Sequence, residues 1–158
     1  RRRSRRRSAS GRRNAALMLP LRHTRVWRIA DIILLLSVLL FAVTPAAWFF
    51  DEAARSISWM RNLDKWLHGL TFLALTLWYA GQYRPQSYWR IAVGLLGFGM
   101  FIELCQRMLS YRTADWLDMG ANTVGILVGL AIAMAGVGGW CLRVENWQTK
   151  RQAGSHRE

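Results

Sequence analysis

One stretch of the sequence places carboxylates, a carboxamide and glycines on the same face of a predicted helix. Successive members of this set are three or four residues apart, and they are Asp115, Asp118, Asn122, Gly125 and Gly129. Residues at this spacing lie on one face of an α-helix. Carboxylates there could bind a cation or act as a general acid or base, whereas glycines allow close contact between helices. Because polar groups at the mouth of an apolar helix are costly, we interpret this face as part of a functional site.

Two further polar groups have the same spacing. Asp64 and His68 are four residues apart, next to Lys65, and Glu103 and Gln106 are three residues apart. Their carboxylate and imidazole groups are of the types that Zn²⁺ or Mn²⁺ accept. However, the spacing matches no known metal or nucleophile motif, and no Ser or Cys is paired with a base. We therefore assign no metal ligand and expect no cofactor.

Long segments without charged residues predict helices that cross a membrane. The 158-residue chain is 53% apolar, and it has no charged residue between Asp31 and Asp51 or from Met119 to Leu142. A bilayer core of ~30 Å requires about 20 apolar helical residues, so these runs are long enough. We predict an all-α polytopic membrane protein, a four-transmembrane-helix bundle with spans at about residues 27–49, 64–83, 88–109 and 117–140. A cleaved signal peptide is the alternative for the first span.

Basic residues are concentrated before the first predicted span. The formal net charge is +13, and eleven of the 22 basic residues lie in the first 28 positions. We expect residues 1–25 to form a disordered basic arm that is attracted to anionic lipid, with Met18 as an alternative translation start. Residues 26–141 would form the membrane domain and residues 142–158 a polar, frayed cytoplasmic tail. A nucleic-acid partner is not expected, since the rest of the chain reads as a membrane protein.

The distribution of Lys and Arg predicts the orientation in the membrane. With the N-terminus in the cytoplasm, 17 basic residues lie on the inner side and five on the outer side. Without residues 1–17 the split is still nine to five. The positive-inside rule therefore places both termini in the cytoplasm. In this orientation the polar groups of the second, third and fourth spans converge at the outer leaflet, whereas the inner ends show no such convergence.

Glu103 and Arg112 each have a structural and a functional interpretation. Glu103 could pair with Arg107, Lys65 or Arg112, or it could belong to a substrate or ion site. Arg112 could reach lipid head groups, but its planar guanidinium is also suited to bidentate recognition of phosphate or carboxylate. We favour Arg112 as an anion-binding residue.

The remaining polar residues also have structural alternatives. His68 could be a hydrogen-bonded packing residue, and Asp64 and Asp118 could be helix N-caps. Asn122 lies too deep to cap a helix, so we expect it to form a hydrogen bond between helices, while Gly125 and Gly129 are expected to pack.

Other residues are expected to serve the membrane environment. Cys105 and Cys141 should lie near opposite ends of the bundle and should not form a disulfide. Five tryptophans fit an interfacial aromatic belt: Trp59, Trp66, Trp89, Trp116 and Trp140.

The order of these motifs resembles the VanZ-like family. The motifs are Asp64-Lys65-x-x-His68, Glu103-x-x-Gln106 and Arg112-x-x-Asp115-x-x-Asp118-x-x-x-Asn122-x-x-Gly125. The resemblance covers about residues 30–140, and it implies a small multi-pass domain in the bacterial cytoplasmic (inner) membrane. Because the family is named after an accessory protein that affects teicoplanin, the resemblance also implies a link to the glycopeptide response.

Three functions fit these observations. The first is a cell-envelope accessory or binding protein whose site, at the extracytoplasmic end of spans 2–4, takes a lipid-linked or peptidoglycan-related ligand. The second is a membrane-embedded, metal-assisted hydrolase or transferase that acts on a lipid-linked substrate, with a carboxylate as general base. The third is a small transporter that works as a homo-oligomer, in contact through Gly125 and Gly129. The outward-facing polar residues of mixed charge favour the first function.

Overall fold

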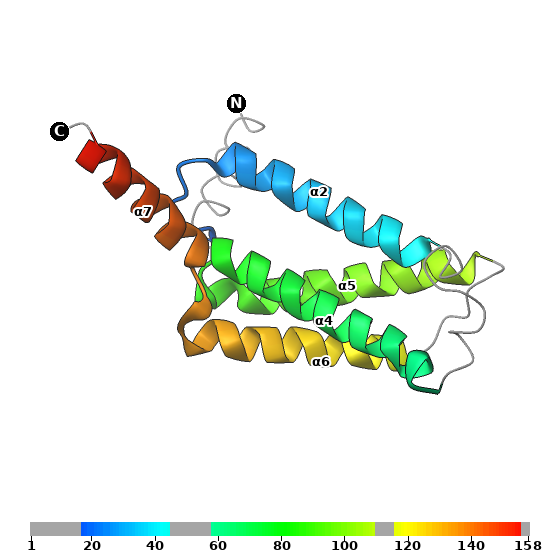
Figure 1. The fold of residues 1–158 in the computed structure, drawn as a ribbon. Helices are drawn as coiled ribbons and strands as arrows, with labels where there is room; N and C mark the ends of the chain where they lie inside the picture. The colour runs from blue at the N-terminus through cyan, green and yellow to red at the C-terminus, as the bar shows by residue number, and fades with distance from the viewer. Residues whose placement is uncertain (1–16, 45–57, 110–115, 156–158) are drawn as a thin grey trace, which may run out of the picture.

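The structure, a computed structural model, describes residues 17–44, 58–109 and 116–155 (Figure 1). Four long helices form the bundle, and a fifth follows them. In chain order the elements are α2 (Thr24–Val43), α4 (Ser58–Gln82), the 3₁₀ turn η2 (Pro85–Ser87), α5 (Tyr88–Arg107), α6 (Trp116–Ile132), the π-helical turn η3 (Ala133–Val137) and α7 (Trp140–Ser155).

The surface of the bundle is that of a membrane protein. Among the described residues, three helical segments are long and apolar enough to cross a bilayer: Thr24–Val43, Pro85–Arg107 and Trp116–Gln152. The fourth helix of the bundle, α4, is 25 residues long and packs against both α5 and α6. Large apolar side chains face outward, for example Leu40 and Val93, which are 67% and 61% exposed. The prediction of an all-α membrane protein is therefore confirmed.

The closest packing in the bundle is between α4 and α6. A Cβ atom at Gly125 would collide with the backbone oxygen of Gly69, and one at Gly129 would lie 2.7 Å from Cβ of Thr76. The two glycines therefore lie in the contact between these helices, where side chains would force them apart. Since both are buried within one chain, these two glycines are not available for a contact between two copies of the chain.

The C-terminal part of the chain differs from the expected frayed tail. Gly136 and Gly139 have φ angles of 117° and 72°, a region that glycine adopts readily and other residues avoid. These two glycines end the fourth span and start α7, which extends away from the bundle (Figure 1). Trp140 packs at the start of α7, and its indole N–H donates to the Leu77 carbonyl at 3.0 Å.

The segment before α2 is tied to the connection between α4 and α5. Leu19 donates its backbone N–H to the Gln82 carbonyl at 2.9 Å, and Arg84 donates to the Leu17 carbonyl at 3.0 Å. The last residues of the expected basic arm thus lie against the bundle. We call this the Gln82 end of the bundle, and the opposite end, where α4 and α6 begin, the His68 end.

Candidate functional site

Three buried side chains from three helices meet at the His68 end. They are His68 of α4, Glu103 of α5 and Asp118 of α6, which are 8%, 5% and 3% exposed. One potential ligand atom from each, a ring nitrogen or a carboxylate oxygen, lies within 4.8 Å of the other two. We call these three residues the polar cluster. Antiparallel packing explains the meeting, because α5 ends where α4 and α6 begin.

Asn122 fixes the orientation of the His68 ring. The ring Nδ1 lies 3.1 Å from Oδ1 of Asn122, and both residues are buried. Because a carboxamide oxygen only accepts, Nδ1 carries the proton in this arrangement. The other ring nitrogen, Nε2, then points to Asp118, whose Oδ2 lies 3.9 Å away. A histidine that donates one N–H to a buried partner while presenting its second nitrogen is the usual arrangement of a metal-ligating imidazole.

Lys65 adds a positive charge at the edge of the polar cluster. Its Nζ lies 3.8 Å from Oδ1 of Asp118, and its side chain is 32% exposed. Lys65 therefore connects the buried Asp118 carboxylate with the surface. A lysine in this position suits contact with an anionic ligand that approaches from outside.

The floor of the site is apolar and closely packed. Phe72 is 1% exposed, and a Cβ atom at Gly99 would lie 3.0 Å from Nδ2 of Asn122 and 3.2 Å from the Phe72 ring. Gly99 therefore lets α5 approach α4 and α6 directly beneath the polar cluster. Gly99 was not predicted from the sequence, because its role depends on a contact between helices.

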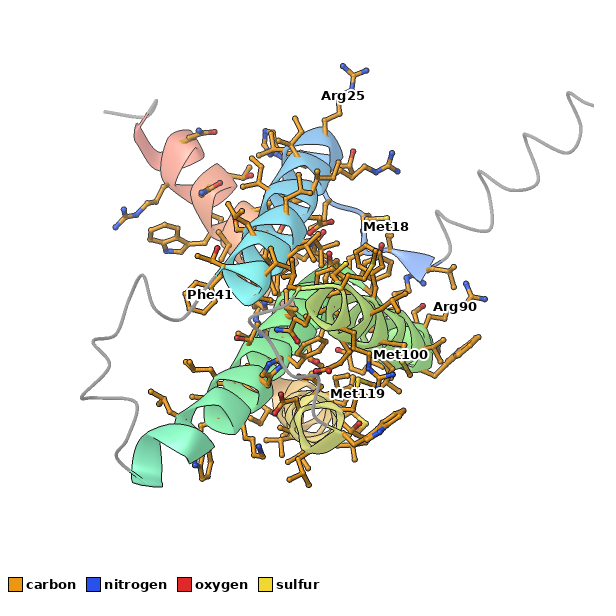
Figure 2. The ribbon with its side chains drawn as sticks, turned by 90° about the vertical axis from the view of Figure 1, so that its right-hand side faces the viewer. Met18, Arg25, Phe41, Arg90, Met100 and Met119 are labelled. Carbon is orange, nitrogen blue, oxygen red and sulfur yellow. The ribbon has the colours of Figure 1, made fainter. Side chains whose placement is uncertain are left out.

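A small cavity adjoins the polar cluster between α5 and α6. Its volume is about 60 Å³, and its lining residues are Met100, Glu103, Leu104, Arg107, Trp116 and Met119. Met100 and Met119 lie near each other on the face seen in Figure 2. Because Trp116 and Leu104 are exposed, the cavity opens on the outer surface of the bundle.

Not every predicted site residue reaches the polar cluster. Gln106 is buried, but its side chain donates to the Ala42 carbonyl of α2 at 2.9 Å and so satisfies the end of that helix. The backbone places Asp64 inside α4, which begins at Ser58, so Asp64 is not an N-cap. Arg112 and Asp115 lie outside the described residues.

Polar residues also meet at the Gln82 end of the bundle, where we expected no such convergence, so this expectation was wrong. Asp31 of α2 accepts hydrogen bonds from Trp78 Nε1 and Gln82 Nε2, each at 2.7 Å. Nearby, the rings of Trp27, Trp78 and Trp140 have centroids 5.6 to 5.7 Å apart. Asp31, an acid at the edge of an apolar span, could have indicated this contact. We used it only as the boundary of the charge-free run.

Glu145 forms a second polar contact at the Gln82 end. It is 5% exposed and accepts hydrogen bonds from the backbone N–H groups of Arg22 and His23, at 2.7 and 3.1 Å, and from Trp27 Nε1 at 3.0 Å. Burial works against its charge, but these donors outweigh burial and lower the pKa of Glu145. Glu145 therefore docks α7 on the start of α2.

Comparison with known proteins identifies a family. The family model described as VanZ/LLP1 matches residues 16–137, which include the four helices of the bundle and every residue of the polar cluster. No curated protein and no solved structure matches the chain.

Proposed function

Since the chain belongs to the VanZ/LLP1 family, we propose that it is a cell-envelope membrane protein that binds a phosphate-bearing, lipid-linked or peptidoglycan-related ligand at the polar cluster, with a divalent metal ion. The observation that carries this proposal is the approach of His68, Glu103 and Asp118 to within 4.8 Å of one another, all three buried. Buried carboxylates are costly in an apolar environment unless they are paired or hold a metal.

The donor set fits a divalent cation. One imidazole nitrogen and two carboxylate oxygens are accepted by Zn²⁺ and Mn²⁺, and the two carboxylates supply negative charge that matches the ion. Three protein ligands leave at least one coordination position for a ligand oxygen. An ion bound there would polarise a phosphoryl oxygen. Asn122 would hold the His68 ring in the tautomer that exposes Nε2, and Lys65 would contact the same phosphate.

The position of the site favours a ligand that is anchored in lipid. The polar cluster lies at one end of a bundle whose outer surface is apolar, and the cavity beside Glu103 is lined by residues of that surface. A phosphate carried on a lipid would meet the polar cluster at the depth of the head groups while its chain stays in the bilayer. The excess of basic residues at the Gln82 end supports an extracytoplasmic His68 end and cytoplasmic termini in the bacterial inner membrane.

Hydrolysis of the bound phosphate is the second candidate function. Three protein ligands with an open position, and a second residue that orients the histidine, are features of catalytic rather than structural zinc sites. In such a reaction water would form a new P–O bond while the bond to the leaving phosphate or alcohol breaks, and the carboxylate oxygen of Glu103 or Asp118 that does not hold the metal would take the proton of the water and pass it to the leaving group. The same site would serve both functions, and product formation distinguishes them.

Reconstitution tests the proposal directly. The wild-type chain in nanodiscs is given Mn²⁺ or Zn²⁺ and a polyprenyl pyrophosphate, and metal content, lipid binding and phosphate release are measured. We expect about one metal ion per chain and metal-dependent lipid binding, both lost in His68→Gln and Asp118→Asn. Glu145→Gln, which alters a buried acid at the opposite end, should leave both unchanged. Lipid binding that is equal in all variants would refute the site, and phosphate release would establish hydrolysis.

The link to glycopeptide response is tested in cells. A strain that lacks the protein is complemented with the wild type or with Asp118→Asn, and its sensitivity to teicoplanin is compared. If the polar cluster mediates the response, only the wild type restores the original sensitivity. Equal sensitivity in all three strains would separate the protein from this phenotype.

A further inference from the structure

A second cavity extends from the Gln82 end along α5 as far as Phe98. Its volume is about 290 Å³, and residues of α2, α4, α5 and the segment before α2 line it. Its walls are mainly apolar, formed by residues that include Leu35, Ile91, Leu95 and Phe98. No side chain of the described residues fills this space, and the polar cluster contributes nothing to it.

Two features of the surrounding helices leave room for the cavity. No residue of α2, which the structure describes in full, is buried. On the opposite wall, a Cβ atom at Gly94 would have no neighbour within 4 Å. A larger side chain at this one position would therefore occupy the space without displacing other atoms.

The polar residues of the cavity carry hydroxyl groups and a guanidinium, whereas those of the polar cluster carry carboxylates and an imidazole. Ser87, Arg90 and the phenols Tyr79 and Tyr83 line it together with the apolar residues. Arg90 is exposed, its guanidinium lies 5.1 Å from the centre of the Trp89 ring, and it extends outward from α5 (Figure 2). The acid on this part of α2, Asp31, is occupied by Trp78 and Gln82. The cavity thus combines an apolar interior with a positive charge at its edge.

We propose that this cavity binds one acyl chain of an anionic phospholipid, whose phosphate contacts Arg90. Charge complementarity selects this occupant. Further arginines lie at the same end of the bundle, including Arg22, Arg25, Arg28 and Arg84, and an arginine recognises a phosphate by parallel, charge-assisted hydrogen bonds. The chain of the lipid fills the space that Leu35 of α2 and Ile91, Leu95 and Phe98 of α5 line. Bound lipid therefore holds α2 against the bundle.

Photocrosslinking in nanodiscs tests this proposal on the full-length chain. The probes are phosphatidylglycerol and phosphatidylcholine with a diazirine at the end of one acyl chain, and the crosslinked residues are mapped by mass spectrometry. We expect phosphatidylglycerol to label the Ile91–Phe98 segment and Leu35, and phosphatidylcholine to label them much less. Arg90→Gln should lower the apparent affinity for phosphatidylglycerol about tenfold, the usual scale for a hydrogen bond to a charged group.

A matched pair of glycine variants separates occupancy of the cavity from general lipid contact. Gly94→Phe should abolish labelling, because its ring fills the cavity. Gly97→Phe, which adds the same ring on α5 where a Cβ atom also meets nothing within 4 Å, should leave labelling unchanged. Equal labelling by both lipids that neither Arg90→Gln nor Gly94→Phe changes would overturn the proposal. If Gly94→Phe fails to fold, the Arg90→Gln comparison still decides.

Discussion

The Nδ1 atom of His68 lies 3.1 Å from the side-chain oxygen of Asn122, and this contact joins α4 to α6 beneath the polar cluster. Both residues are buried, so water does not compete for the hydrogen bond. The contact decides which ring nitrogen faces Asp118 and Glu103. The uncharged Asn122 therefore determines which ring nitrogen His68 presents to the two carboxylates.

Replacing Asn122 should weaken metal binding without removing a ligand. We expect Asn122→Ala to lower the affinity for Mn²⁺ or Zn²⁺ about 10- to 100-fold, the usual effect of losing a partner that orients a ligating histidine. Isothermal titration calorimetry in detergent measures this change. Thr123→Ala is the matched control, because the Thr123 hydroxyl donates only to the Met119 carbonyl of its own helix at 2.8 Å. Unchanged affinity in Asn122→Ala would show that this hydrogen bond serves folding alone.

The contact between α4 and α6 predicts opposite effects at two glycines of α6. Gly125→Ala should destabilise the bundle by about 1–3 kcal/mol, because the new methyl group meets the backbone of Gly69 and cannot be accommodated by a change of rotamer. Gly120→Ala should be neutral or stabilising by up to about 1 kcal/mol, since its Cβ atom meets nothing within 4 Å and alanine favours the helix. Unfolding of both variants in mixed detergent micelles provides the comparison. Equal stability of the two would contradict the close packing of the helices.

Acid should loosen the docking of α7 through Glu145. Its pKa is lowered in the folded protein, so its carboxylate stabilises the fold at pH values above its unfolded pKa, and this contribution is lost as the pH falls through the folded pKa. Thermal unfolding in detergent should therefore show decreasing stability below about pH 4.5, the ordinary value for glutamate. Glu145→Gln should be less stable than the wild type at pH 7 and should show a flatter profile in acid. Parallel profiles for the two proteins would assign the acid sensitivity to other carboxylates.

Helical spacing predicted much of what the structure shows at the His68 end. His68, Glu103 and Asp118 each lie on an amphipathic face at the same end of an apolar run, and three antiparallel helices bring such faces to one depth. We expected Asn122 to form a hydrogen bond between helices, and it does so with His68, but the identity of this partner was not predictable. It depends on the register of α4 against α6, which Gly125 and Gly129 set by close contact.

The Gln82 end was harder to predict for a physical reason. Asp31, Trp78 and Glu145 lie on α2, α4 and α7, and no periodic pattern within one helix connects them. The position of α7 depends on the backbone at Gly136 and Gly139, where positive φ angles redirect the chain. The sequence shows glycines there but not the direction that the chain takes after them.

A metal ion bound at the polar cluster should stabilise the folded protein, increasingly as the metal concentration rises above its Kd. A ligand that binds only the folded state stabilises it by about 2.7 kcal/mol at a concentration 100 times its Kd. Adding Mn²⁺ or Zn²⁺ to the metal-depleted protein should therefore raise its melting temperature, and EDTA should reverse the rise. Glu103→Gln and Asp118→Asn should show no rise, because each removes one of three buried ligand groups, whereas Glu145→Gln should respond as the wild type does. A rise of the same size in all four proteins would place the metal at another site and remove the main support for metal-assisted phosphate binding.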